Sequence, residues 1–144
     1  MRIRTDRKAV AAVEFALVAP VLCLVFMGML EMGRALNVQI ALTNAVREGC
    51  RGFADNGGAL SSGYTPGTSA YAQYLVTDSL NNSSLHINTA SLNVTSSTTS
   101  ITVSGLTATQ VTVTATLPYS AVSYFPAFIM NGRNLKATIT MKKS

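Results

Sequence analysis

Hydrophobic and polar positions divide the chain into two unlike parts, and the first is a long apolar block. From Ala9 to Leu30 the sequence holds one carboxylate, Glu14, and no basic residue. At ~1.5 Å of rise per residue, these residues would form a helix of roughly 33 Å, enough to cross a hydrocarbon core of ~30 Å. The block therefore predicts a membrane-spanning helix.

The helical pattern continues beyond this block, because residues 35–53 contain no proline and keep apolar residues at helical spacing. We expect one helix of roughly 65 Å from about Val10 to Phe53. Its outer half would present an apolar stripe to a globular head, and glycines followed by an Asp-Asn-Gly-Gly run would end it. The stripe is Leu36, Ile40, Val46, Cys50 and Phe53, interrupted at Thr43, and the terminating residues are Gly49, Gly52 and the run 55–58.

The remainder changes to the pattern of a small mixed domain. A Gly/Ser/Pro loop over 61–69 leads to a short helix predicted over 70–80. Strict alternation of apolar and threonine-rich positions then predicts strands over 110–117 and 135–142, with a weaker strand over 91–96 and another at 101–103. The predicted fold class is α+β: a long N-terminal transmembrane helix, then a small antiparallel sheet packed on its outer half.

Composition and charge support this division and set an orientation. The 144 residues are 48% hydrophobic and 12% charged, too apolar for an ordinary small soluble domain. Of the eleven basic residues, four precede the block, which predicts a cytoplasmic N-terminus and a C-terminal head outside the cytoplasm. No basic stripe interleaved with aromatic residues occurs, so we expect no nucleic-acid partner. The four residues are Arg2, Arg4, Arg7 and Lys8.

A cleavable secretory signal is the first alternative for the N-terminus. Such signals have apolar regions of about 7–15 residues that end in a small-x-small site. Here the triplet Ala9-Val10-Ala11 comes before the apolar block, and the sequence after Leu30 holds no obvious site. The pattern favours a membrane anchor over an ordinary secretory signal.

Glu14 makes the anchor unusual. A carboxylate near the centre of a spanning helix costs about 2.5–3.5 kcal/mol on insertion scales, so it usually meets a partner. Alternatively, a residue this close to the start of the block snorkels to the lipid headgroups. Position alone leaves both interpretations open, and the pattern of residues 7–15, basic, small, apolar and then Glu-Phe, favours a partner.

This pattern resembles the class III signal of type IV-like prepilins, and in particular the TadE-like proteins of the tight-adherence (Flp) pilus system. The match runs through AAVEFALVAP at 11–20 and continues with Glu31-Met32-Gly33-Arg34 after the anchor. The resemblance implies cleavage by a prepilin peptidase between Ala9 and Val10, which makes 1–9 a leader, 10–54 the transmembrane and extended helix, and 55–144 the head. Prepilins most often carry Gly before the cut, where this chain has Ala9.

The spacing has a physical reason of its own. Cleavage after Ala9 would expose an amino group on Val10, one turn from Glu14, and each charge is unfavourable in low dielectric unless it meets the other. A neighbouring subunit's Val10 amine can neutralise Glu14, which would set the axial register of an assembly. We expect Glu14 and Phe15 to serve subunit assembly and Ala12, Ala16 and Pro20 to serve helix packing, although alanine is also simply abundant in membrane helices.

Nothing in the sequence indicates catalysis, a metal or a cofactor. The one histidine, His86, lies in a Ser/Thr-rich segment and is expected at the surface. Cys23 and Cys50 would lie ~40 Å apart on one helix, far beyond the ~6 Å that a disulfide tolerates. We expect Cys23 in lipid and Cys50 as a buried free thiol, with an intermolecular thiol as the alternative.

An aromatic loop between two predicted strands, residues 119–130, stands out in the head and includes Tyr124, Phe125 and Phe128. It either closes the open edge of the core or provides a contact surface for a neighbouring pilin or the membrane.

Two functions follow from these patterns. The first is a minor pilin or pseudopilin in the assembly of a Tad/Flp pilus for adhesion or secretion, with a prepilin peptidase, other pilins, the assembly platform and the lipid bilayer as partners. The alternative is a permanently membrane-tethered binding protein that never enters a pilus.

Overall fold

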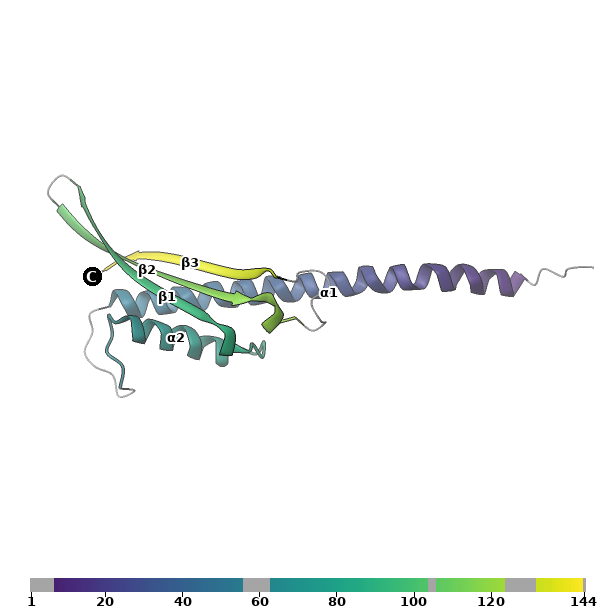
Figure 1. The fold of residues 1–144 in the computed structure, drawn as a ribbon, viewed down its shortest axis with the longest axis horizontal. Helices are drawn as coiled ribbons and strands as arrows, with labels where there is room; N and C mark the ends of the chain where they lie inside the picture. The colour runs from purple at the N-terminus through teal and green to yellow at the C-terminus, as the bar shows by residue number, and fades with distance from the viewer. Residues whose placement is uncertain (1–6, 56–62, 104–105, 124–131, 144) are drawn as a thin grey trace, which may run out of the picture.

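A single long helix organises the molecule. The computed structural model describes residues 7–55, 63–103, 106–123 and 132–143. Helix α1 (Arg7–Ala54) has 48 residues and continues through Pro20. Figure 1 shows its N-terminal half projecting from the head as a bare rod, whereas its C-terminal half is covered by the sheet and a second helix. The predicted long helix and the α+β class are confirmed.

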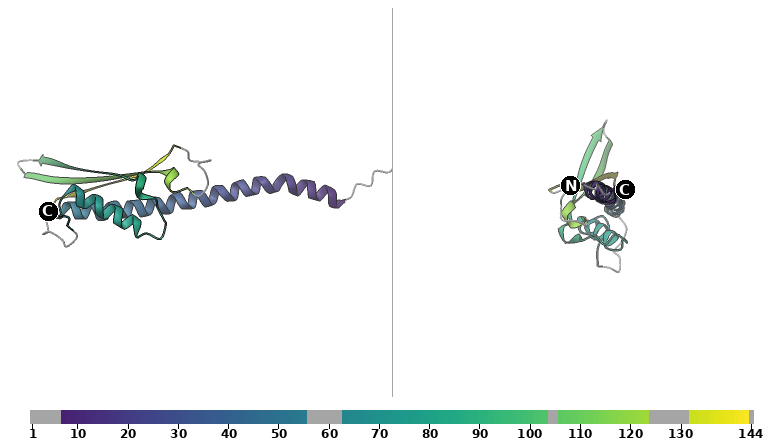
Figure 2. Two further views of the ribbon diagram at one scale, coloured as in Figure 1. Left: turned by 60° about the horizontal axis from the view of Figure 1, so that its bottom comes forward. Right: turned by 90° about the vertical axis from the view of Figure 1, so that its right-hand side faces the viewer.

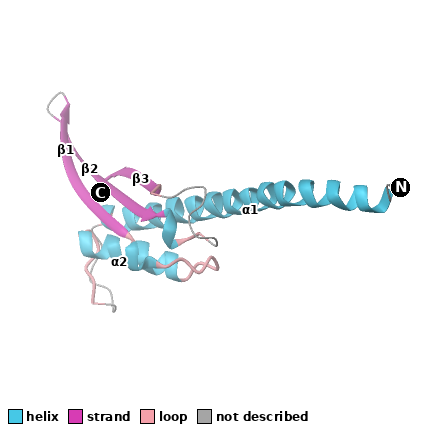
Figure 3. Ribbon diagram, turned by 45° about the vertical axis from the view of Figure 1, so that its right-hand side comes forward, coloured by secondary structure: helices cyan, strands magenta, loops and turns pink. Residues whose placement is uncertain are grey.

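The second helix, α2 (Ser69–Asn81), lies along the outer half of α1 and agrees with the helix predicted over 70–80. Its N-cap is Thr68, whose hydroxyl accepts a hydrogen bond of 3.3 Å from the backbone N–H of Tyr71. Figure 3 shows α2 next to the outer half of α1. Both helices also pack on the sheet: α1 contacts β2 and β3, and Gln73 of α2 donates a hydrogen bond to the backbone oxygen of Val94 in β1.

The expectation that Gly49 and Gly52 end the helix is wrong, because both lie inside α1 and provide its contact with α2. A Cβ added to Gly49 would lie 2.9 Å from the carbonyl oxygen of Ala72, and one added to Gly52 would collide with the side chain of Leu75. Only a residue without a side chain lets the two backbones approach this closely. α1 ends two residues after Gly52, at Ala54.

The sheet has three antiparallel strands in the order β1-β2-β3: β1 (Asn93–Val103), β2 (Leu106–Pro118) and β3 (Asn134–Lys142). The strands predicted over 110–117 and 135–142 are confirmed as parts of β2 and β3. The strands predicted over 91–96 and 101–103 are confirmed at 93–96 and 101–103, but their separation is wrong, because β1 is continuous and pairs with β2 along its whole length. Polar residues between the two segments hid this continuity. Short 3₁₀ turns, η1 (Thr89–Ser91) and η2 (Tyr119–Ala121), flank the hairpin.

The core forms between α1, α2 and one face of the sheet. On β2 the alternating residues Val111, Val113, Ala115 and Leu117 are fully buried, as the period of two predicts. On α1 the predicted stripe is only half right: Val46, Cys50 and Phe53 are buried, whereas Leu36 and Ile40 are 57% and 60% exposed. The buried stripe instead begins at Ala35, Val38 and Leu42, which lie on a different face of α1 from Leu36 and Ile40.

The opposite face of the sheet carries paired threonines, as predicted. The hydroxyls of Thr112 and Thr140 lie 2.9 Å apart, and those of Thr114 and Thr138 lie 3.0 Å apart, in cross-strand pairs of β2 and β3. Such pairs contribute roughly 0.2–1 kcal/mol each relative to alanine. The sheet is thus held by an apolar layer against the helices and by hydroxyl pairs on its outer face.

Candidate assembly site along the long helix

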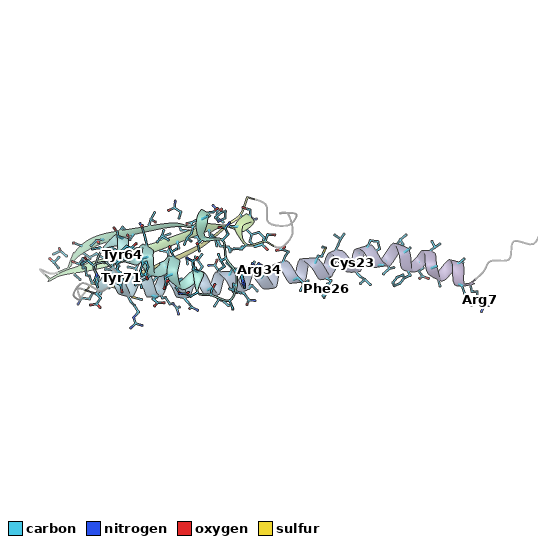
Figure 4. All side chains as sticks on the ribbon, turned by 90° about the horizontal axis from the view of Figure 1, so that it is seen from below. Arg7, Cys23, Phe26, Arg34, Tyr64 and Tyr71 are labelled. Carbon is cyan, nitrogen blue, oxygen red and sulfur yellow. The ribbon has the colours of Figure 1, made fainter. Side chains whose placement is uncertain are left out.

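The N-terminal half of α1, residues 7–30, is here called the stem. Its most apolar stretch is not buried by any other described part of the chain, and it is long and apolar enough to span a membrane by length and composition. Figure 4 shows Arg7, Cys23 and Phe26 along this bare rod, with Arg34 where the head begins. The chain therefore has one N-terminal apolar helix suited to anchoring in a membrane.

The residues predicted for processing and assembly all lie on the stem. Ala9 and Val10 are in the first turns of α1, and Val10 is 56% exposed. Glu14 follows Val10 by four residues, which places the two side chains on one helix face. Phe15 is 71% exposed, and Ala12, Ala16 and Pro20 are exposed as well. Nothing else among the described residues packs on these positions, so they are open to contacts from outside the chain.

The head begins at a buried carboxylate. Glu31 is only 7% exposed, and two hydroxyls donate hydrogen bonds to its side chain: Tyr119 to Oε2 and Ser123 to Oε1, the latter at 3.0 Å. The Tyr119 hydroxyl also lies 3.2 Å from the backbone oxygen of Glu31. These bonds join the first residue beyond the apolar block to the turn that follows β2.

Arg34 makes the second attachment, one helical turn further. Its Nε donates to the backbone oxygen of Val122, and its Nη2 donates to that of Leu85 at 3.1 Å. One guanidinium thus holds the turn after β2 and the segment after α2 together on α1. We call Glu31, Arg34, Tyr119 and Ser123 the junction cluster.

Burial within the junction cluster changes the acidity of its tyrosine. Tyr119 is 2% exposed, and its burial, together with its hydrogen bond to Glu31, raises its pKa to about 12. Both causes act because the phenolate would be poorly solvated and would face a carboxylate. The hydroxyl therefore remains a donor to Glu31 at any physiological pH.

The motif Glu31-Met32-Gly33-Arg34 is divided by the helix into two faces. Glu31 and Arg34 turn toward the head, whereas Met32 is 51% exposed and a Cβ added to Gly33 would meet nothing within 4 Å. Met32, Leu36 and Ile40 follow at intervals of four residues and form an exposed apolar ridge on α1. Leu36 and Ile40, which the sequence pattern predicted to be buried, belong to this apolar ridge.

The sequence analysis named Glu31, Gly33 and Arg34 and singled out residues 119–130, but it did not predict that Tyr119 and Ser123 bind Glu31. The available signal was weak: Tyr119 follows the last alternating residues of β2, at a position where the apolar period predicts another buried side chain. Its partner Glu31 is 88 positions away, and such pairing is not readable from local pattern. The aromatic residues Tyr124, Phe125 and Phe128 lie outside the described residues.

The remaining candidate chemistry is structural. Cys50 is buried and free, as predicted, with Sγ 3.6 Å from the backbone oxygens of Val111 and Ile139, and burial raises the pKa of its thiol. Cys23 is a free thiol exposed on the stem. His86 is exposed, as predicted, and its φ of 48° is left-handed. Within the described residues, no three His, Cys, Asp or Glu side chains are grouped to hold a metal ion.

A bare apolar stem, a buried carboxylate where the head begins and a helix-mounted antiparallel sheet together define a membrane-anchored protein of pilin-like architecture. Comparison with protein families is more specific. A family model described as TadE-like protein matches residues 9–51, which includes the whole stem beyond Lys8 and most of the head-bearing half of α1. The resemblance drawn from the sequence is confirmed: residues 9–51 are similar to TadE-like proteins.

The family match ends before α2 and the sheet, so it covers the helix and not the rest of the head. Neither a curated protein nor a solved structure matches the chain. What the head does must therefore be argued from its own residues.

Proposed function

We propose that this protein is a minor pilin or pseudopilin that takes part in assembly of a Tad (Flp) pilus, used for adhesion or secretion. It acts by helix packing and performs no chemistry of its own. The observation that carries the proposal is the division of α1, in which the TadE-like match spans both an unpacked apolar stem and the motif that attaches the head.

The proposed assembly contact centres on Glu14. In a single chain its carboxylate lies on an exposed apolar helix, where a charge facing lipid is unfavourable. Cleavage after Ala9 would give a neighbouring subunit an α-amino group on Val10, and pairing of the two charges would lower the cost of burying both. The pair would fix the axial register of this subunit against the next.

The head-bearing half of α1 offers a second support. An interior helix glycine costs roughly 1 kcal/mol relative to alanine, and nothing in the described fold requires one at Gly33. Beside it lies the apolar ridge, whose members Met32, Leu36 and Ile40 are exposed. A glycine next to an apolar ridge permits close approach of another helix, which we assign to a neighbouring pilin.

The partners follow from this mode of action: a prepilin peptidase, other pilins with their assembly platform, and the lipid bilayer of the inner membrane. The N-terminus would be cytoplasmic and the head extracytoplasmic. The junction cluster would keep the head in one orientation on the helix while the stem leaves lipid and enters the filament.

Replacement of Glu14 tests the proposal. Glu14→Ala should leave membrane insertion intact, because it removes a charge from an apolar segment, and it should leave the head folded. Pilus formation, or co-purification with the other pilins, should be lost. Glu48→Ala is the matched control, because Glu48 is an exposed carboxylate on the same helix but beside the head. Normal piliation by Glu14→Ala at matched protein levels would refute the assembly role.

A further inference from the structure

Strand β1 lies at an edge of the sheet, and among the described residues nothing pairs with the outward backbone groups of its distal half. The register identifies them. Val94 accepts a hydrogen bond of 3.3 Å from Gln73 of α2 on its backbone oxygen, so the Val94 peptide groups point away from β2. The Lys143 N–H donates to the Thr109 oxygen at 2.8 Å, so odd-numbered residues of β2 direct their peptide groups toward β3. Even-numbered residues of β2 therefore face β1, and their partners on β1 are the odd-numbered residues, which agrees with the outward direction at Val94.

Peptide groups in an antiparallel strand alternate between its two edges. Counting in twos from Val94 therefore places the N–H and C=O groups of Thr98, Ser100 and Thr102 on the outer edge of β1. Among the described residues, none donates to or accepts from these backbone groups. The outer edge of β1 is thus covered by Gln73 at Val94, whereas its backbone groups at Thr98, Ser100 and Thr102 have no partner among the described residues.

Strand β3 does not extend along the distal part of the β1–β2 hairpin. Lys142, the last residue of β3, pairs with Gln110 of β2, whose partner on β1 is Thr99. Beyond that point β1 and β2 form a two-stranded arm over residues 100–103 and 106–109, which projects past the end of α1 in Figures 1 and 2. All of residues 98–102 are exposed. Two-stranded ribbons of this kind are marginally stable unless another strand or a helix joins them.

The two edges of the sheet differ in their protection against pairing. Strand β3 carries Lys136 and Lys142 on its outer-edge positions, and Gln39 of α1 donates to the Lys136 oxygen at 2.9 Å. Lysines and covering side chains are common devices against edge-to-edge association. Strand β1 has no charged residue, no proline and no bulge in its pairing with β2. Residues 79–132 contain no Asp, Glu, Lys or Arg at all.

We infer that the edge of β1 at Thr98–Thr102 is a strand-addition site, which is completed by an extended, uncharged segment of a different protein on the same side of the membrane. Backbone groups of that segment pair with Thr98, Ser100 and Thr102 and extend the sheet to four strands. The absence of charge along the edge selects an uncharged partner, since a charged strand would find no counter-charge there. The inference does not depend on pilus assembly, because a permanently tethered head presents the same edge.

A second copy of this chain fits the edge poorly. Antiparallel pairing of β1 with β1 requires a two-fold axis normal to the sheet, and this operation reverses the direction of α1. Figures 1 and 2 show α1 running along the sheet, so the two stems of such a dimer would point in opposite directions. Two anchors in one membrane cannot do this.

Photo-crosslinking of the full chain in its host membrane tests the site. A benzophenone amino acid at Thr98 is compared with the same probe at Thr138, an exposed outer-edge residue of β3. The expected result is an adduct from Thr98 and none from Thr138, with the crosslinked peptide mapping to an uncharged segment of another protein.

Two edge variants carry the test further, each with the probe at Thr98. Ser100→Pro removes the outward N–H, and Ser100→Lys leaves the backbone intact but places a charge on the edge. Both should abolish the adduct, whereas Ser100→Ala should retain it. The lysine variant keeps the test valid even where proline disturbs the arm. Absence of an adduct, an adduct to a second copy of this chain, or an adduct that survives Ser100→Lys would overturn the inference.

Discussion

The hydroxyl of Tyr119 donates a hydrogen bond to the carboxylate of Glu31, across 88 positions of sequence. This contact ties the turn after β2 to the first residue of α1 beyond its apolar block. Removal of either partner would take one hydrogen bond from a buried polar group, which costs about 1–3 kcal/mol. Orientation of the head on its stem therefore depends on a few polar contacts and not on core packing alone.

Alkaline pH should weaken the head through Tyr119. Because its pKa rises from near 10 in the unfolded chain to about 12 in the folded one, the stabilisation is complete below pH 10 and is lost as the pH rises through 12. Stability falls with rising pH because the folded state favours the neutral form of the tyrosine. Thermal unfolding of the full chain in detergent micelles should show a falling midpoint over this range.

Tyr119→Phe provides the control for that titration. The variant should be less stable at pH 7 by about 1–3 kcal/mol, because Glu31 loses a donor. Its stability should then fall less steeply than that of the parent above pH 10, since the other tyrosines and the lysines titrate in both proteins. Equal alkaline slopes would show that Tyr119 does not titrate as its surroundings require.

Two glycines of α1 should respond in opposite ways to the same substitution. Gly49→Leu should lower head stability by about 1–3 kcal/mol or more, because a side chain there meets the Ala72 backbone of α2. Gly33→Leu should leave the unfolding midpoint unchanged or raise it, since nothing lies near its added Cβ. Gly33→Leu should instead reduce recovery with other pilins. If Gly33→Leu destabilises the head and spares assembly, the helix-contact role of Gly33 is wrong.

The mature chain should begin at Val10 in cells with an active prepilin peptidase. Ala9 and Val10 are exposed on the stem, and the basic residues that precede them would remain in the cytoplasm. Intact-mass measurement of the membrane-extracted protein should show loss of residues 1–9. Ala9→Phe should block the cut, and Ala9→Gly should speed it. Retention of residues 1–9 would favour the permanently tethered alternative.

Residues from about Glu31 onward should lie outside the cytoplasm, because the excess of Arg and Lys precedes the stem. A reporter active only outside the cytoplasm, fused after Ser144, should give signal. A reporter active only in the cytoplasm should be silent at the same position. Reversal of these two results would reverse the topology.

Local pattern was sufficient for most elements of this fold. An apolar helical block, an uninterrupted helical stretch and strict alternation over 110–117 each depend on neighbours within a few residues, and the helix and the strand that they predict are confirmed. The break predicted within β1 failed because serine and threonine tolerate both strand and loop, and pairing with β2 decided between them. The TadE-like motif was likewise readable because its residues are consecutive.

The sequence by itself determined that the chain is an apolar helix followed by an α+β head, and that Glu31, Gly33 and Arg34 belong to one short motif after the apolar block. Tertiary structure alone decided which residues of that motif contact the head and which remain exposed. It buried Glu31 and half-buried Arg34 against residues 51 to 92 positions away, and it left Gly33, Leu36 and Ile40 exposed. The reason is geometric: helical periodicity defines which residues share a face, but the elements that pack on α1 select which face is covered, and these contacts join segments far apart in sequence.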